Sequence, residues 1–229
     1  MCGRYASARH PGDLADSFDA VDATEGRCLP ADYNVAPTKE VHAVLVRHGV
    51  RQLRVLRWGL VPSWAPDVSG GARLINARIE TVAGKPAFRS AWLRRRCLVP
   101  ADGWYEWAPA TDRPGRQPYF VTPADGSLLA FAGLYEVRDG LLTATIITTA
   151  ATGPLTALHD RMPVLLDRAR WADWLAPEAD PPDLAASATG SGLQVRAVGA
   201  AVGNVNNNGP ALTAPRLEPV PVPVPQTLF

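Results

Sequence analysis

The hydrophobic pattern predicts a chain built mainly of short strands. Apolar and β-branched residues dominate seven runs, at 41–47, 50–58, 97–107, 118–122, 128–136, 141–149 and 195–198. Two-residue turn signals lie between or within several of these runs, namely His48-Gly49, Asp102-Gly103, Asp125-Gly126 and Asp139-Gly140. This alternation of strand and tight turn indicates antiparallel hairpins.

Four segments have the composition of short helices. They are 11–21, with Asp13 as a possible N-cap, 86–95, opened by Pro86, and 154–160 and 167–176. Many strands with few helices predict the α+β class, with a twisted, barrel-like, mainly antiparallel sheet. No linker divides the chain, so we expect one domain over 1–215. Alternating Val-Pro residues predict an extended, mobile tail over 216–229.

Composition is that of an ordinary globular protein, with 229 residues, 47% of them hydrophobic. No apolar stretch reaches the roughly 20 residues that a membrane helix needs, and the first ten residues lack the apolar core of a secretory signal. We therefore expect a cytoplasmic protein with no membrane partner.

Charge is nearly balanced overall, at +1, but unevenly distributed. Residues 1–100 hold 15 Lys and Arg against 9 Asp and Glu, whereas residues 101–229 hold 8 against 13. A basic surface built from the first half would suit phosphate groups, and arginine in particular binds them through two parallel hydrogen bonds. Ordinary surface scatter explains the same numbers.

The three cysteines, Cys2, Cys28 and Cys97, show no metal-site or disulfide spacing. We expect no metal and no organic cofactor. Cys97 lies in an apolar run and reads as a small buried residue, whereas Cys2 follows the initiator Met1 directly.

Polar residues that core packing does not demand gather in six segments, five of which contain glycine, proline or tryptophan. The segments are MCGR (1–4), YNVAPT (33–38), WGLVPSW (58–64), NARIET (76–81), ADGWYEW (101–107) and the stretch from Thr148 to Pro163, which contains HDRMP (159–163). Turn chemistry explains any one of them, but not their combination.

These motifs, in this order, resemble the SRAP (SOS response-associated peptidase) family from residue 1 to 163. A weaker match, VGNVNNNGPAL, extends the likeness to about residue 212 and departs from the family pattern at Asn208, where we expect an acidic residue. The resemblance implies that the chain binds single-stranded DNA at abasic sites and reacts with them covalently.

Cys2 carries the chemistry that this resemblance implies. Removal of Met1 would leave an α-amine and a thiol on adjacent carbons, with ordinary pKa values of about 8 and about 8.5, so both would be partly deprotonated at neutral pH. An aldehyde condenses with the amine to a Schiff base, and the thiolate then closes a five-membered thiazolidine ring. The resemblance supplies the aldehyde, which is the opened sugar of an abasic site.

Three further residues are expected to act with Cys2. Glu106, flanked by Trp104, Tyr105 and Trp107, should be poorly solvated, with a raised pKa suited to proton transfer. The resemblance implies that Glu106 assists sugar opening, that His159 moves protons with its ring oriented by Asp160 or a backbone carbonyl, and that Asn76 positions Cys2 or the sugar. A surface glutamate and a structural histidine are the plain alternatives.

The candidates for DNA contact are cations and flat side chains near these four residues. Arginines and aromatic rings suit phosphates and bases respectively, and tryptophans are also common in protein cores. The set is Arg4, Arg78 and Arg161, then Lys39, Arg73, Lys85 and Thr149, with Pro37, Trp64 and Trp107 for stacking.

Three functions remain open from the sequence. The first is a covalent abasic-site binder, bound to the nucleoid when it engages DNA. The second is a peptidase or amidohydrolase with Cys2 as nucleophile, and the same residues could cleave the Met1–Cys2 bond autocatalytically. The third is a non-covalent single-strand DNA module. No feature suggests a subunit interface, so we expect a monomer.

Overall fold

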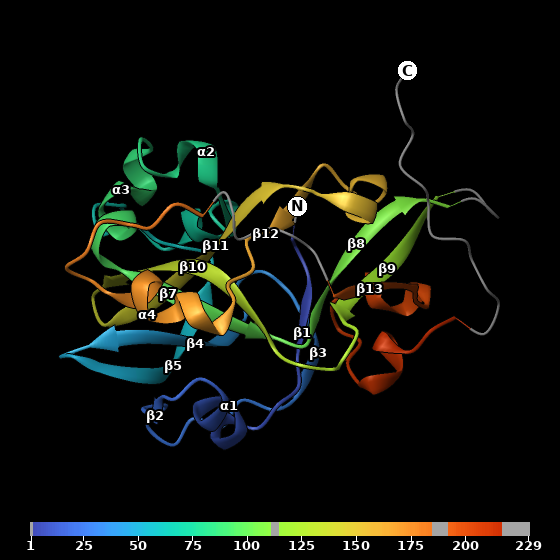
Figure 1. Ribbon diagram of the computed structural model, residues 1–229, viewed down its shortest axis with the longest axis horizontal. Helices are drawn as coiled ribbons and strands as arrows, with labels where there is room; N and C mark the ends of the chain where they lie inside the picture. Colours follow the sequence, from blue (N-terminus) through green and yellow to red (C-terminus); the bar gives the residue numbers. More distant parts are fainter. Residues whose placement is uncertain (1, 111–114, 185–191, 217–229) are drawn as a thin grey trace.

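Two β-sheets with short helices around them make up the computed structural model (Figure 1). It describes residues 2–110, 115–184 and 192–216. The fold is mostly β with mixed and antiparallel sheets, as the strand pattern predicts.

The larger sheet closes on itself through a ring of hydrogen bonds. Its order is β12-β11-β10-β7-β4-β5-β2, and a parallel pairing between β5 and β11 joins the two sides, with Thr143 opposite Arg57. β6 adds to β11 in parallel. Its strands are β2 (Val21–Asp22), β4 (Glu40–Arg47), β5 (Val50–Trp58), β6 (Asn76–Arg78), β7 (Arg96–Ala101), β10 (Leu129–Arg138), β11 (Leu141–Ala150) and β12 (Arg161–Pro163).

The smaller sheet has the order β13-β9-β8-β1-β3 and is antiparallel throughout. β1 lies between β8 and β3, so the start of the chain is held inside a sheet rather than at its edge. Its strands are β1 (Tyr5–Ser7), β3 (Asp32–Val35), β8 (Gly103–Pro109), β9 (Arg116–Pro123) and β13 (Leu193–Ala197).

Two predicted hairpins are confirmed by their turn geometry. His48 and Gly49 between β4 and β5 have φ values of 52° and 74°, and Asp139 and Gly140 between β10 and β11 have 50° and 80°. Positive φ at both central residues is the requirement of a type I′ turn, whose twist matches that of the strands.

The turn at Asp102-Gly103 differs from expectation. β7 and β8 do not pair, because the chain leaves the larger sheet at Ala101 and enters the smaller one at Gly103. A Cβ at Gly103 would lie 2.4 Å from the Val121 carbonyl oxygen, so only glycine fits this crossing. Asp102 secures it by accepting the Ala8 backbone N–H at 2.7 Å.

The helices are shorter than the pattern predicts. α1 (Pro11–Ser17) ends before β2, and its N-cap is His10, whose Nδ1 accepts the Gly12 N–H, so the assignment of Asp13 as cap was wrong. The predicted 86–95 helix is confirmed as α3 (Pro86–Arg94). The other described helical elements are α2 (Ile79–Val82), α4 (Trp171–Leu175) and the 3₁₀ turns η1 (Ser69–Arg73), η2 (Gly153–Ala157), η3 (Arg168–Arg170), η5 (Ala200–Gly203) and η6 (Pro210–Thr213).

One expected helix is a 3₁₀ turn, and the other is part 3₁₀ and part α-helix. The 154–160 segment forms η2, and the 167–176 segment is η3 followed by five residues of α4. Pro177 follows α4 and disfavours helical backbone at Ala176, which is extended, so the second segment ends there.

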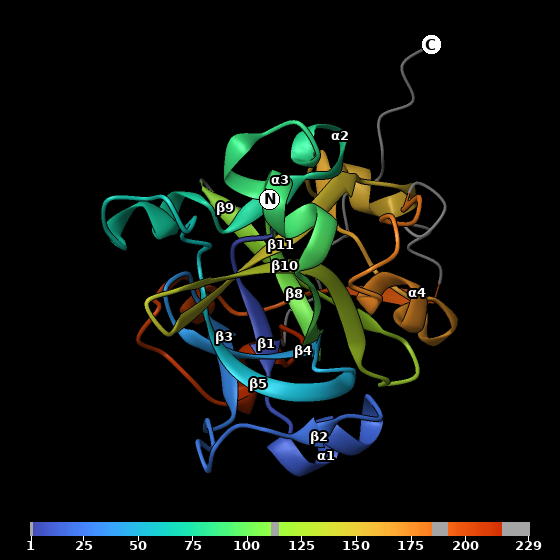
Figure 2. The ribbon, with the colours of Figure 1, turned by 90° about the vertical axis from the view of Figure 1, so that its left-hand side faces the viewer.

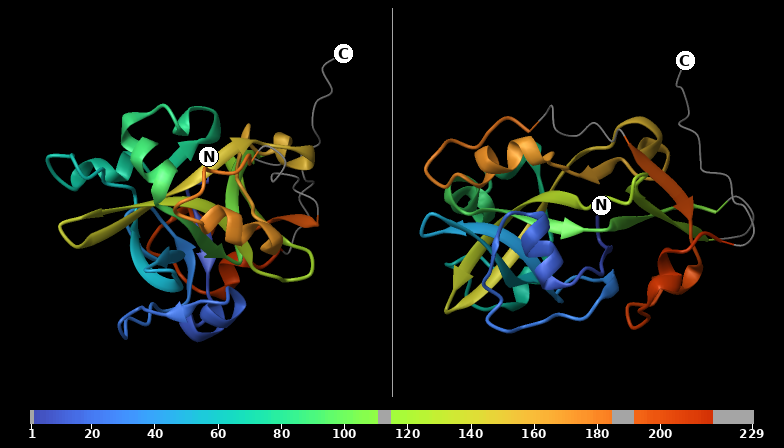
Figure 3. Two further views of the ribbon diagram at one scale, coloured as in Figure 1. Left: turned by 60° about the vertical axis from the view of Figure 1, so that its left-hand side comes forward. Right: turned by 60° about the horizontal axis from the view of Figure 1, so that its bottom comes forward.

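The helices cover the open faces and ends of the sheets. Figure 2 shows α1 and β2 beneath the β4–β5 hairpin, with α2 and α3 at the opposite end. Figure 3 shows the η5–η6 segment beside β13 at the far end of the smaller sheet. Among the described residues, no helix is long and apolar enough to cross a membrane.

The predicted tail falls mostly outside the described residues. Its first residue, Arg216, is bonded to the body of the protein: its backbone N–H donates to the Ala197 carbonyl at 2.9 Å, and its guanidinium donates to Gln117 at 2.8 Å.

Candidate active site

Cys2 lies at the entrance to β1 and is fully buried in the core between the two sheets. Asn76 on β6 donates its side-chain amide to the Cys2 carbonyl oxygen at 2.8 Å. The parallel pairing of β6 with β11, with Asn76 opposite Ile146, carries this amide to the start of β1. The structure thus brings together two predicted residues that are 74 positions apart.

The Cys2 thiol is held protonated. Burial raises its pKa well above the usual range, and the negative charge of Glu106 raises it further. This direction holds for the chain that still carries Met1, whereas the partly deprotonated thiol is expected only after Met1 is removed and stays a prediction. A reaction at sulfur needs a neighbouring group to take its proton.

Glu106 on β8 has that capacity. The residue is only 4% exposed. This burial raises the pKa of its carboxyl to about 7. The nearby charge of Asp160 adds to the rise, whereas the guanidinium of Arg116 opposes it. The predicted desolvation of Glu106 is confirmed, and at neutral pH the carboxyl is close to half protonated, ready to give or take a proton.

His159 follows η2 and is oriented by its neighbours. Its Nδ1 lies 2.6 Å from Oδ1 of Asp160 and 2.9 Å from the backbone nitrogen of Arg161. A proton on Nδ1 would be donated to Asp160, and without it Nδ1 accepts the Arg161 N–H. Burial, followed by nearby positive charge that includes Arg116, lowers the pKa of His159, which favours the second arrangement and a neutral ring.

The predicted cations divide into paired and unpaired groups. Arg4 donates to Asn34 Oδ1 at 2.7 Å, Lys39 to Asp32 at 2.7 Å, and Arg161 contacts Glu80 at 2.6 and 3.0 Å. Arg78 and Lys85 are exposed and make no ion pair with any carboxylate of the described residues, as is also true of Arg73.

Arg161 makes several hydrogen bonds within the fold. Besides its two contacts with Glu80, it donates to the Thr148 carbonyl at 2.6 Å, and its side chain is 12% exposed. The adjacent Thr149, opposite Met162 in the β11–β12 ladder, is half-buried.

The stacking candidates differ in exposure. Trp64 is 66% exposed and borders a cavity of about 360 Å³ with Pro62, Arg73 and Leu74. Trp107 and Pro37 are half-buried, and the Arg4 guanidinium lies 5.8 Å from the centre of a Trp107 ring. Trp58, by contrast, is a core residue at 1% exposure.

Two residues near this site were not predicted from the sequence. Asn34 is fully buried and joins Arg4 to the η5–η6 segment. Arg116, at the start of β9, donates to the Trp107 carbonyl and acts electrostatically on both Glu106 and His159. The YNVAPT motif contains Asn34 and so offered a signal for it. Nothing in the sequence around Arg116 singles it out.

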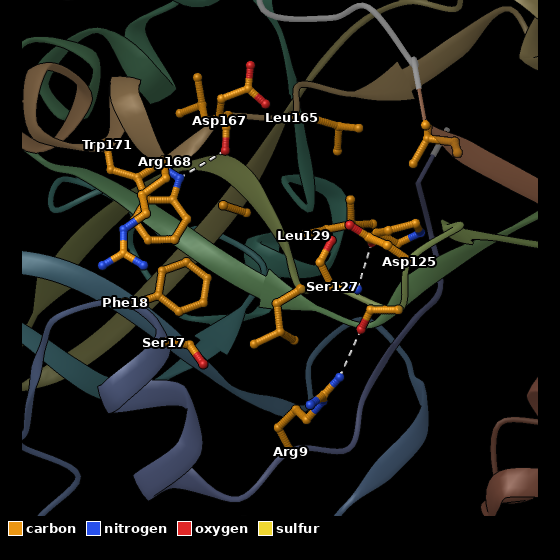
Figure 4. A pocket seen from close by; sticks show the side chains of 17 residues that line it. Arg9, Ser17, Phe18, Asp125, Ser127, Leu129, Leu165, Asp167, Arg168 and Trp171 are labelled. Atoms are coloured by element: carbon orange, nitrogen blue, oxygen red, sulfur yellow. Dashed lines mark hydrogen bonds between the residues drawn. The ribbon is translucent and has the colours of Figure 1, made fainter.

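A further cavity lies elsewhere. It measures about 530 Å³, and its lining includes none of the predicted site residues. Figure 4 shows Phe18 and Trp171 stacked on its wall, with ring centres 4.4 Å apart, and Arg9 at its rim. Among the described residues, no group of three or more His, Cys, Asp or Glu side chains is placed to hold a metal ion.

Sequence comparison connects this chain to known proteins. Residues 1–205 match the family described as SOS response associated peptidase (SRAP), and the chain belongs to that family. Abasic site processing protein YoaM of Bacillus subtilis is 40% identical over 190 residues, which cover 80% of this chain and 82% of YoaM. Abasic site processing protein YedK of Escherichia coli is 32% identical over 234 residues, 94% of this chain and 100% of YedK.

Solved structures share the fold. A protein from Bacteroides thetaiotaomicron superimposes with a TM-score of 0.81 at 20% identity, covering 94% of this chain and 100% of that one. A phage-related protein from Bordetella bronchiseptica gives 0.67 at 29% identity, covering 86% and 94%. The family resemblance of the six motifs is therefore confirmed, and the relatives at 32–40% identity are named for abasic site processing.

Proposed function

We propose that this protein binds single-stranded DNA at abasic sites and forms a covalent thiazolidine crosslink through Cys2 after Met1 is removed, which shields the lesion. The observation that carries the proposal is the juxtaposition of Cys2 with Asn76 and with the charge of Glu106. This supports the proposal, because the proposed nucleophile, positioning amide and proton-transfer group are then neighbours.

The chemistry begins at the Cys2 amine. The amine nitrogen attacks the aldehyde carbon of the opened sugar, and loss of one water gives a Schiff base. The thiol sulfur then bonds to the same carbon, the C=N electrons return to nitrogen, and the thiol proton passes to that nitrogen. Aldehyde and aminothiol thus give thiazolidine and water, with no oxidant or reductant.

Glu106 and His159 are the residues that move protons in these steps. A carboxyl with a pKa of about 7 exists in both protonation states at neutral pH, so it can protonate the departing hydroxyl and receive the thiol proton. Asn76 is a positioning residue, because it fixes the Cys2 carbonyl and hence the direction of the amine.

DNA contact falls to the residues around this centre. Exposed Arg78 and Lys85 are the cations with capacity for phosphate, and Arg4, Lys39, Arg73 and Arg161 are secondary. Trp107, Pro37 and Trp64 offer surfaces for bases, as single-strand binders do with aromatic rings, and Thr149 offers a hydroxyl near Arg161. We expect the active species to be a monomer.

A gel experiment tests the proposal. Purified protein is incubated with a single-stranded oligonucleotide that contains one abasic site and is then separated under denaturing conditions. Wild type should give a heat-stable shifted band, and Cys2→Ala should give none. Cys28→Ala is the matched control, because Cys28 is an exposed free cysteine outside the site. An undiminished band in Cys2→Ala would refute the mechanism.

A second function has some support from the same residues. The family is described as a peptidase, and Cys2, Glu106 and His159 are the kinds of group that hydrolyse amides. We propose that these residues also release Met1 autocatalytically. Glu106→Gln purified from cells that lack methionine aminopeptidase activity should then retain Met1 while wild type loses it. Equal loss of Met1 in both would assign the cleavage to another enzyme.

A further inference from the structure

Arg116 lies on the same face of the smaller sheet as Trp107. In the β8–β9 ladder Trp107 is opposite Pro118 and Arg116 is opposite Pro109. Opposed residues share a face and alternate positions return to it, so the side chains of Arg116 and Trp107 project to one side.

A hydrogen bond directs the guanidinium back along β8. Arg116 Nη2 donates to the Trp107 carbonyl oxygen, two residues nearer the reactive centre than its own ladder partner. Its charge there lowers the pKa of both Glu106 and His159. The guanidinium therefore lies against the Trp107 backbone, within electrostatic range of Glu106 and His159.

Arg116 differs from two other cations near the site. Arg4 is held by Asn34 and by the Val202 carbonyl, and Arg161 by Glu80. Arg116 is exposed and makes no ion pair with a carboxylate within residues 2–110, 115–184 and 192–216. One of its nitrogens is used by Trp107, which leaves other donors of the guanidinium fork for an anion.

We propose that Arg116 is a binding residue for a backbone phosphate of the damaged strand, next to the nucleotide that stacks on Trp107. The proposal rests on the function proposed above. It assigns to this chain a phosphodiester contact on the Trp107 side of the reaction centre, with Arg78 on the β6 side. A guanidinium suits this ligand because it donates two parallel hydrogen bonds to phosphate oxygens.

Salt dependence of binding isolates this contact. The probe is a single-stranded oligonucleotide with a tetrahydrofuran abasic analogue, which has no aldehyde and so reports non-covalent binding. Each neutralised phosphate adds about 0.7 to the slope of log affinity against log salt for single strands. Arg116→Ala should reduce the slope by about 0.7, and Arg116→Lys should largely keep it. Arg47→Ala, which removes an exposed arginine from the β4–β5 hairpin, should leave it unchanged.

The outcomes separate this proposal from the proposed function. A slope equal to wild type in Arg116→Ala overturns the phosphate contact, even where wild type still crosslinks natural abasic DNA. A slope that falls as expected supports the contact, even where no crosslink forms. An unchanged slope with a shifted pH profile of crosslinking at saturating DNA also overturns it, because Arg116 would then act only on Glu106 and His159.

Discussion

At the scale of the residue, the site depends on burial that the sequence shows only in part. The sequence around Glu106 predicted its desolvation correctly, since the residue is buried in the structure and burial raises the pKa of its carboxyl. The protonated state of Cys2 was not predicted. MCGR is a polar-looking start, and only the pairing of β1 between β8 and β3 shows that Cys2 lies in the core.

The raised pKa of Glu106 has a consequence for stability. A carboxyl whose folded pKa is about 7, against an ordinary value of 4.5, is protonated in the folded state while it ionises in the unfolded state. Stability from this group is therefore full below about pH 4.5 and falls as pH rises to 7. The loss is on the order of 3 kcal/mol for a shift from 4.5 to about 7.

Glu106→Gln should remove that dependence. Above pH 7 the variant should be more stable than wild type in urea unfolding, and the difference should shrink towards pH 4.5. Stability profiles that run parallel for the two proteins would contradict a raised pKa for the buried carboxyl.

The crosslinking rate of wild type should change with an apparent pKa near 7, and Glu106→Gln should lose this change and most of the rate.

At the scale of the element, the long strands were predictable and the short ones that hold the site were not. β4, β5, β10 and β11 have eight to ten residues each, enough for a pattern to show. β6 and β12 have three each, and they form because β11 offers them a partner. Asn76 and Arg161 thus owe their positions to pairing with β11, which no local sequence pattern shows.

The crossing at Gly103 gives a test at this scale. Gly103→Ala would force a methyl group against the Val121 carbonyl and the Phe120 ring, which should destabilise the protein by about 1–3 kcal/mol. Gly199→Ala is the control, because a Cβ there meets nothing within 4 Å. Chemical denaturation of both variants measures the difference. Equal midpoints would show that the start of β8 tolerates a Cβ against β9.

At the scale of the whole molecule, hydrogen bonds join residues 204–208 to segments near the start of the chain. The side-chain amide of Asn34 donates to the carbonyls of Asn204 and Asn207 at 2.9 and 3.0 Å, while its oxygen accepts from Arg4. Asn208, the departure from the family pattern, donates to Ala31 and accepts from Tyr33, so it also ties this segment to β3. The motif order predicted the family, but not this contact between distant segments.

Asn34→Ala should remove the side-chain hydrogen bonds that join Arg4 to Asn204 and Asn207. Loss of buried hydrogen bonds leaves backbone carbonyls without partners and should lower stability by about 1–3 kcal/mol. Hydrogen exchange should rise in residues 200–213 and in β1, and abasic DNA binding should weaken as Arg4 loses its orientation. Exchange that rises uniformly over the larger sheet instead would contradict a local role.

The central claim is that one residue supplies both the amine and the thiol of a thiazolidine. Intact mass spectrometry of the crosslinked product, with and without borohydride, tests it most directly. The expected mass is that of the protein without Met1 plus the oligonucleotide minus one water, unchanged by borohydride because a closed ring has no C=N bond to reduce. An adduct that retains Met1, or one that gains two hydrogens on reduction, would contradict the account.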